Sequence, residues 1–153
     1  MAAQPVVAIV MGSKSDEPGM KECMEVLERF GLQYESRIMS AHRTPNKVAR
    51  FAGEAQSKGI RVIIAAAGLA AALPGVVAAH TLLPVIGVPM AGGPLQGKDA
   101  LYAIVQMPAG IPVATVGIGN AKNAALLAVS ILSLADPLLQ QKLADARKEY
   151  GDE

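Results

Sequence analysis

Short apolar runs alternate with longer segments of helical periodicity along the whole chain. The apolar runs are rich in β-branched and small residues, and most are continuous rather than alternating in polarity, which is typical of strands buried on both faces of a sheet. They predict strands at Val6–Met11, Tyr34–Met39, Val62–Ala66, Pro84–Val88 and Val113–Val116.

Segments with a helical spacing of apolar residues separate these runs. The first has one apolar stripe and ends at Gly31, a residue type that commonly terminates helices. That stripe consists of Met20, Cys23, Met24, Leu27 and Phe30. The predicted helices are Asp16–Phe30, Pro45–Lys58, Ala70–His80, Lys98–Gln106 and Asn120–Leu134.

A final amphipathic helix is predicted after Asp136 and Pro137. Its apolar side consists of Leu138, Leu139, Leu143 and Ala146. The pattern leaves open whether this helix packs on its own domain or on a neighbouring subunit.

Strands that alternate with helices predict an α/β fold, in which right-handed crossovers join a central parallel sheet covered by helices on both faces. We therefore expect a three-layer sandwich of flavodoxin-like or Rossmann-like type. Its 153 residues suit one domain, residues 1–153, without linker or repeat.

Charge and composition narrow the function classes. The chain has 14 Lys and Arg against 13 Asp and Glu, so no overall basic field favours nucleic acid or an anionic membrane. No signal peptide or membrane span is predicted, and the lone Cys23 excludes a disulfide within the chain, which together suggest a cytoplasmic protein. Because 52% of the residues are hydrophobic, mostly small and aliphatic, we expect an oligomer.

Two polar clusters follow the first two predicted strands. Residues 12–16 read Gly-Ser-Lys-Ser-Asp, and residues 40–45 read Ser-Ala-His-Arg-Thr-Pro. Ligands of open parallel sheets bind beyond the carboxyl ends of the strands, where both clusters should lie. Histidine moves protons near neutral pH, so His42 is the candidate acid or base, and the planar guanidinium of Arg43 suits a phosphate.

Each cluster also has a purely structural interpretation. Ser15 or Asp16 could cap the helix that follows, and Thr44 with Pro45 could begin the next one. Alternatively, the hydroxyls of Ser13 and Ser15 would bind a phosphate, and Asp16 would accept hydrogen bonds from ribose hydroxyls.

The other loops carry little chemistry. Residues 65–75 offer backbone amides and close approach only. Residues 92–97 could be mobile or ligand-facing, but they and residues 117–120 are interpreted as ordinary turns rather than as a site. His80 is interpreted as structural or interfacial. No spacing suits a metal, and neither the dinucleotide nor the P-loop motif is present, so a ligand of mononucleotide size remains.

Both polar motifs resemble the signatures of the class I N5-carboxyaminoimidazole ribonucleotide mutases. The likeness continues through residues 73–75, 84–89, 104–108 and 123–126, in the order and at the intervals of that family. The resemblance implies a flavodoxin-like subunit of a homo-octamer, without metal or organic cofactor, acting on an aminoimidazole ribonucleotide and CO2 in purine biosynthesis. It implies that Ser13, Asp16 and Arg43 bind the ribose phosphate beside Ser15, Ser40 and Ala41, and that His42 transfers the proton.

The loop at residues 65–75 departs from the family pattern. It has Ala66 and Leu69 where class I members usually have glycine, and Ala72 where they have histidine. His80 cannot replace that histidine, because eight residues along a helix span about 12 Å. Three hypotheses therefore stay open: the mutase, a carboxylase or decarboxylase that uses CO2 with the same or a related heterocycle, and a non-catalytic nucleotide-binding scaffold.

Overall fold

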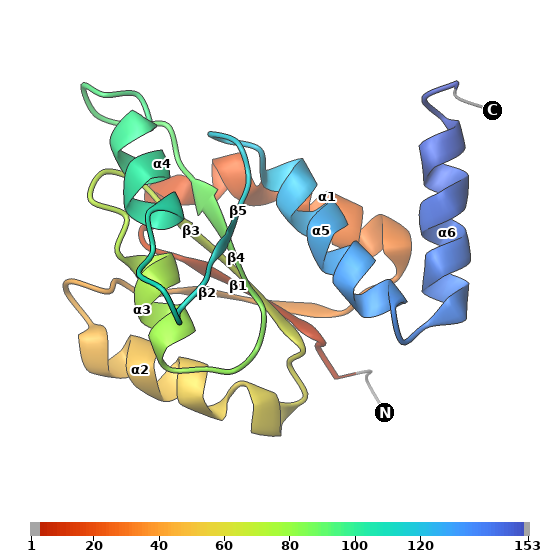
Figure 1. The fold of residues 1–153 in the computed structure, drawn as a ribbon, viewed down its shortest axis with the longest axis horizontal. Coiled ribbons are helices and arrows are strands. Elements are labelled where there is room, and N and C mark those ends of the chain that lie inside the picture. The colour runs from red at the N-terminus through yellow and green to blue at the C-terminus, as the bar shows by residue number, and fades with distance from the viewer. Residues whose placement is uncertain (1–3, 152–153) are drawn as a thin grey trace.

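A five-stranded, fully parallel sheet with strand order β2-β1-β3-β4-β5 forms the centre of the computed structural model, which describes residues 4–151 (Figure 1). The strands are β1 Val7–Met11, β2 Tyr34–Ile38, β3 Val62–Ala67, β4 Val85–Pro89 and β5 Ala114–Thr115. This order is that of the flavodoxin-like folds, so the predicted fold class is confirmed.

Helices cover both faces of the sheet. The α-helices of the described chain are α1 Lys21–Phe30, α2 Pro45–Glu54, α3 Leu73–Ala79, α4 Lys98–Val105, α5 Ala121–Ser133 and α6 Pro137–Lys148, of which α6 packs on other helices. In Figure 1, α2, α3 and α4 lie on one side of the sheet and α1 and α5 on the other, which gives the three layers. Within residues 4–151, none of these helices has the length and apolar character needed to cross a bilayer.

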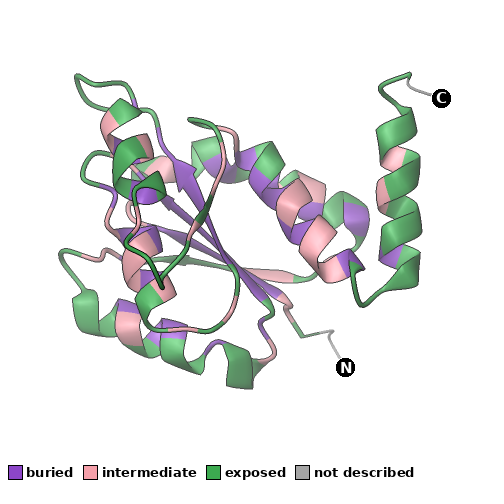
Figure 2. Cartoon of the chain, in the orientation of Figure 1, coloured by how far each residue is buried: buried purple, intermediate pink, exposed green. Residues whose placement is uncertain are grey.

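The core lies on the two faces of the three central strands. All residues of β1, β3 and β4 are buried (Figure 2). Their alternate side chains belong to the two separate hydrophobic clusters on either side of the sheet. A fully buried isoleucine or leucine contributes roughly 1.5–3 kcal/mol relative to an exposed one, so side chains such as Ile9, Ile64 and Leu27 hold the layers together. The edge strand β2 is half-buried or exposed throughout.

Cys23 belongs to this core. Burial raises the pKa of its thiol to about 12, which suits a structural role and disfavours a nucleophilic one.

Several element boundaries differ from the predictions for local reasons. The α-helix before Phe30 begins at Lys21 rather than Asp16, because Pro18 and Gly19 break the segment into two short 3-10 turns, Lys14–Asp16 and Pro18–Met20. The helix predicted to reach Lys58 ends at Glu54 and continues as a 3-10 turn, Gln56–Lys58. Strand β5 is reduced to Ala114–Thr115.

The helix after β3 also starts later than predicted, at Leu73 instead of Ala70. Leu69 and Ala71 have φ angles of 53° and 34°, which a right-handed helix cannot contain. The chain therefore makes an irregular turn before α3.

The C-terminal helix α6 packs on its own domain, which settles the question left open by its sequence. Leu139 is buried, and Leu143 and Ala146 are half-buried against a cluster that includes Phe30 and Val129. Asp136 caps the helix by accepting hydrogen bonds from the Leu138 and Leu139 amides at 3.0 and 3.1 Å. The prediction was wrong for Leu138, whose side chain is largely exposed.

Gly87 in β4 should tolerate no side chain. A Cβ atom there would overlap Ile104 Cγ2 and lie 3.1 Å from Val113 Cγ1 and 3.4 Å from Pro74 Cβ. We expect Gly87→Ala to lower the free energy of unfolding, measured by urea denaturation, by about 1–3 kcal/mol because the core is overpacked.

Gly92→Ala is the matched control. A Cβ atom at Gly92 would have no neighbour within 4 Å, so this change should alter the free energy of unfolding by less than about 0.5 kcal/mol. Equal stabilities of the two variants would contradict the proposed close packing of β4 against α4.

Candidate functional site

The strand order places a cavity at the carboxyl edge of the sheet. From β1 the chain continues to β2 on one side of the sheet, and from β3 it continues to β4 on the other side. The strand order therefore reverses between β1 and β3, which is where ligands of open parallel sheets bind. A cavity of about 940 Å³ lies there, large enough for a mononucleotide-sized ligand. It is lined by residues from the loops after β1, β2, β3 and β4.

All seven predicted site residues line this cavity. They are Ser13, Ser15, Asp16, Ser40, Ala41, His42 and Arg43. The expected convergence of the two polar motifs is therefore confirmed, and we call their side of the cavity the polar wall.

Parallel hydrogen bonding brings the two motifs to the same level. The Met39 amide donates to the Met11 carbonyl at 2.9 Å, and the Gly12 amide donates to the Ala66 carbonyl at 3.0 Å. The loops after β1, β2 and β3 therefore leave the sheet side by side.

The loop after β1 is organised by a capping box. Ser13 Oγ accepts a hydrogen bond from the Ser15 amide at 3.3 Å and one from Ser15 Oγ at 2.9 Å, while Asp16 Oδ2 accepts one from the Ser13 amide at 3.1 Å. Burial raises the pKa of the half-buried Asp16 carboxyl, and the hydrogen bond from Ser13 opposes that effect. Capping is observed, but the N-cap residue is Ser13 rather than Ser15 or Asp16; Asp16 is its partner three residues on, and the turn that they cap is Lys14–Asp16 rather than α1. This capping holds the polar groups at the cavity.

The loop after β2 is a closed turn that presents His42 and Arg43. The Thr44 amide donates to the Ser40 carbonyl at 2.8 Å, and the Arg43 amide donates to Ser40 Oγ at 3.1 Å. Thr44 precedes α2 as predicted, but its hydroxyl does not cap the helix: it accepts from the Ser40 amide and donates to the Ser40 carbonyl, both at 3.0 Å.

His42 and Arg43 are exposed on this turn. Among residues 4–151, Arg43 has no carboxylate within salt-bridge distance. Its guanidinium is therefore available to an anionic ligand.

The opposite side of the cavity carries no ionisable side chain. It consists of residues 67–73, from the end of β3 onward, and residues 90–93 after β4, and we call it the apolar wall. Its functional groups are backbone amides and carbonyls, as the sequence predicted for the loop after β3. Ala72 lines it directly, so His42 supplies the one imidazole among the residues that line the cavity.

Some lining residues were not identified from the sequence. Gly92 and Gly93 border the cavity, which favours the ligand-facing alternative for their segment over an ordinary turn. Gly19 and Met90 also line it without having been singled out. The available signal was topological, because β4 ends at the same edge of the sheet as β1 and β3.

His80 lies outside the cavity at the end of α3. Its Nδ1 is 2.9 Å from the Val76 carbonyl oxygen, which is consistent with the predicted structural role. Over the part of the chain that the structure describes, no group of three or more His, Cys, Asp or Glu side chains is arranged to hold a metal ion.

Comparisons with known proteins agree with this architecture. The family model described as AIR carboxylase matches residues 6–153. The N5-carboxyaminoimidazole ribonucleotide mutases of Pyrococcus horikoshii and Saccharolobus solfataricus are 56% and 54% identical to this chain; the matches cover 95% and 97% of it and 82% and 92% of the relatives.

A solved structure has the same fold. The crystal structure of Treponema denticola PurE matches with a TM-score of 0.88 at 33% identity, over 97% of this chain and 92% of that one. Because a family model spans almost the whole chain and relatives of over 50% identity match it nearly end to end, the chain belongs to the AIR carboxylase family.

Proposed function

We propose that this chain is an N5-carboxyaminoimidazole ribonucleotide mutase of purine biosynthesis. The observation that carries the proposal is the single cavity in which an imidazole and an unpaired guanidinium lie beside the capped loop after β1, in a chain 54–56% identical to proteins of that name. The product would be 4-carboxy-5-aminoimidazole ribonucleotide, and all 153 residues would form one catalytic domain.

The polar wall would bind the ribose phosphate. Arg43 would hold phosphate oxygens with its planar fork, and the hydroxyls of Ser13 and Ser15 would donate to the same group. Asp16 would accept a hydrogen bond from a ribose hydroxyl, because a carboxylate beside the phosphate itself would repel it. Ser40 and Ala41 would border the sugar from the turn after β2.

The reaction needs one proton-transfer group and an enclosed space. The carboxylate leaves the exocyclic nitrogen as CO2, that nitrogen takes up a proton, and carbon 4 of the ring attacks the CO2 and then loses its own proton. His42 would receive the ring proton, since it is the imidazole on the cavity. Holding both fragments in one pocket raises their effective concentration above that of free CO2 in solution.

A CO2-dependent carboxylase is the second candidate. Ala72 leaves the apolar wall without an imidazole, and the phosphoribosylaminoimidazole carboxylase of Ogataea methanolica is 54% identical over 136 residues, 89% of this chain and 25% of that protein. A paired assay separates the candidates: the mutase consumes N5-carboxyaminoimidazole ribonucleotide without added bicarbonate, whereas the carboxylase turns over aminoimidazole ribonucleotide only in its presence. Failure of both reactions in folded protein would contradict both proposals.

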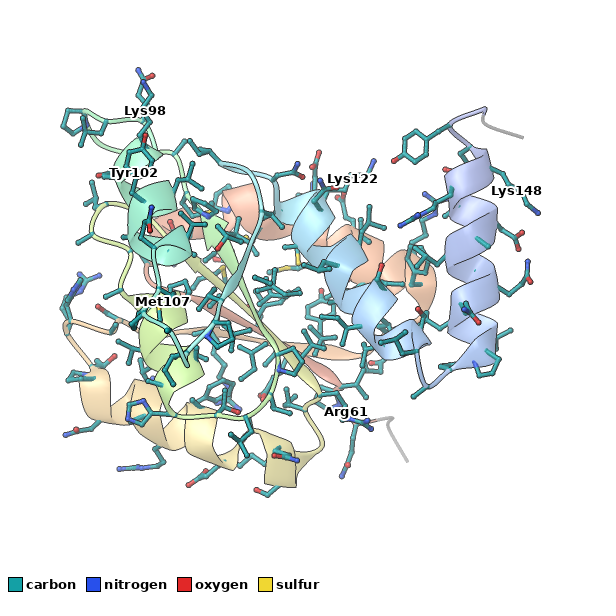
Figure 3. All side chains as sticks on the ribbon, viewed as in Figure 1. Arg61, Lys98, Tyr102, Met107, Lys122 and Lys148 are labelled. Carbon is teal, nitrogen blue, oxygen red and sulfur yellow. The ribbon has the colours of Figure 1, made fainter. Side chains whose placement is uncertain are left out.

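We also infer a cytoplasmic homo-octamer. Exposed apolar side chains gather around α4 and β5, including Leu95, Tyr102, Val105 and Ile118. Figure 3 shows Tyr102 on α4, with Met107 following that helix near α3. Light scattering of the purified protein should give a mass eight times that of the 15.8 kDa chain, and a monomeric mass would refute this assembly.

His42→Asn should slow turnover strongly while the affinity for the ribonucleotide is kept. Loss of a positioned proton-transfer group typically slows a reaction by about 10²–10⁴-fold. Steady-state kinetics with the carboxylated substrate, and calorimetric binding of aminoimidazole ribonucleotide, measure the two effects.

His80→Asn is the matched control, because His80 is exposed outside the cavity. It should retain the wild-type rate. If His42→Asn also retained it, the non-catalytic nucleotide-binding scaffold would become the better interpretation.

Arg43→Ala should weaken binding of the ribonucleotide. A charge-assisted hydrogen bond is worth about 1.5–3 kcal/mol, so the dissociation constant should rise by about 10- to 100-fold, and Arg43→Lys should restore part of the loss. Arg50→Ala, which removes an exposed arginine of α2 outside the cavity, is the control in the same calorimetric titration. Equal affinities of the Arg43→Ala and Arg50→Ala variants would refute the phosphate role.

A further inference from the structure

Two of the three non-glycine residues with left-handed backbone in the described chain, Leu69 and Ala71, line the cavity. The φ angles of Leu69, Ala71 and Gln96 are 53°, 34° and 51°. All three lie in the loops after β3 and β4. Such conformations are unfavourable for residues with a Cβ, and they persist where the surrounding structure imposes them, which is frequently at functional sites.

Leu69 is the least expected of the three, because a bulky side chain is rare in this conformation. Its side chain lies on the backbone of Gly93: Leu69 Cδ2 is 2.6 Å from the position that a Cβ atom at Gly93 would occupy. Any side chain at Gly93 would displace it. Leu69 therefore joins the loop after β3 to the loop after β4 along the apolar wall.

This contact leaves most of the leucine uncovered. Leu69 is 56% exposed, whereas the other large apolar side chains of the wall, Leu73 and Met90, are 2% and 8% exposed and belong to the core. Leu69 is thus the large apolar group that the wall offers to a bound molecule. An exposed leucine on strained backbone contributes little to the stability of the fold. The position of Leu69 on the cavity therefore points to a role in the reaction.

We propose that Leu69 keeps CO2 beside the ring between the two half-reactions, an inference that rests on the proposed mutase function. When the bond between the exocyclic nitrogen and the carboxyl carbon breaks, CO2 has no net charge and can leave the pocket before the carbon–carbon bond forms. The apolar wall offers no side-chain acid or base to hydrate it, and the Leu69 side chain over this wall excludes water and obstructs escape. Leu69 thereby determines how often the carboxyl group is transferred rather than lost.

The fate of a labelled carboxyl group tests this role. N5-carboxyaminoimidazole ribonucleotide carrying ¹³C in its carboxyl group is turned over by wild-type enzyme and by Leu69→Gly, Leu69→Ala and Leu69→Met. The measured quantity is the ratio of label released as bicarbonate to label retained in the product, corrected for spontaneous loss without enzyme. This ratio does not depend on the amount of folded enzyme.

We expect Leu69→Gly and Leu69→Ala each to raise the released-to-retained ratio by about tenfold or more, since loss of an apolar contact in a pocket has effects of this size. Leu69→Met, which restores an apolar side chain of similar volume, should keep the ratio near that of wild type. Leu82→Ala, which truncates a 98% exposed leucine away from the cavity, is the control and should not change it.

Each outcome decides the proposal. An unchanged ratio in both truncations would overturn it, and so would a change in Leu69→Gly alone, which would assign the effect to the backbone at φ 53° instead of the side chain. A folded wild-type protein that does not consume the substrate would refute the proposed function itself. That result differs from active wild-type enzyme with unaltered partitioning in the variants, which would refute only the role of Leu69.

Discussion

The parallel pairing of β1 with a neighbour on each side is the constraint on which the site depends. Met11 lies opposite Ile38 of β2 and opposite Ala66 of β3, so all three strands end at one level. Hydrogen bonds just beyond the strands, from Met39 to Met11 and from Gly12 to Ala66, extend this register into the loops. Because a slip by one residue would send the buried side chains of β1 to the opposite face, burial of that strand keeps the polar motifs together.

Small side chains make this arrangement compact. Helix α5 is buried through Ala121, Ala124, Ala125 and Ala128, and Gly87 lets Ile104 of α4 approach β4 closely. The same preference for small residues shapes the apolar wall, where alanine and glycine leave room for a ligand. Small aliphatic residues thus allow the helices to pack closely on the sheet and also leave the cavity open.

The cavity separates two kinds of chemistry on its two sides. Hydroxyl, carboxylate, imidazole and guanidinium groups come from the loops after β1 and β2, while the loops after β3 and β4 contribute backbone and aliphatic groups. A polar, phosphorylated end of a ligand and an uncharged fragment would therefore find separate surroundings within one site. Because position 72 is alanine, His42 is the one imidazole among the lining residues, and under the proposed function proton transfer would depend on it alone.

The sequence alone determined the layer architecture and the polar half of the site. Strand–helix alternation depends on local hydrophobic periodicity, and the motifs at residues 12–16 and 40–45 consist of residue types whose chemistry is visible without a fold. Element ends were less predictable where backbone geometry intervened, as at Pro18 and Gly19 before α1 and at Leu69 and Ala71 before α3.

Only the tertiary structure decided the apolar half. Gly93 and Met90 carry no reactive group, so nothing in their residue types marks them as part of a site, and the contact between Leu69 and Gly93 joins loops that follow different strands. The amphipathic pattern of α6 likewise did not show whether this helix packs on its own domain, as it does in the structure. Local sequence specifies which side chains an element presents, whereas the partner they meet depends on how distant elements are placed by the register of the sheet.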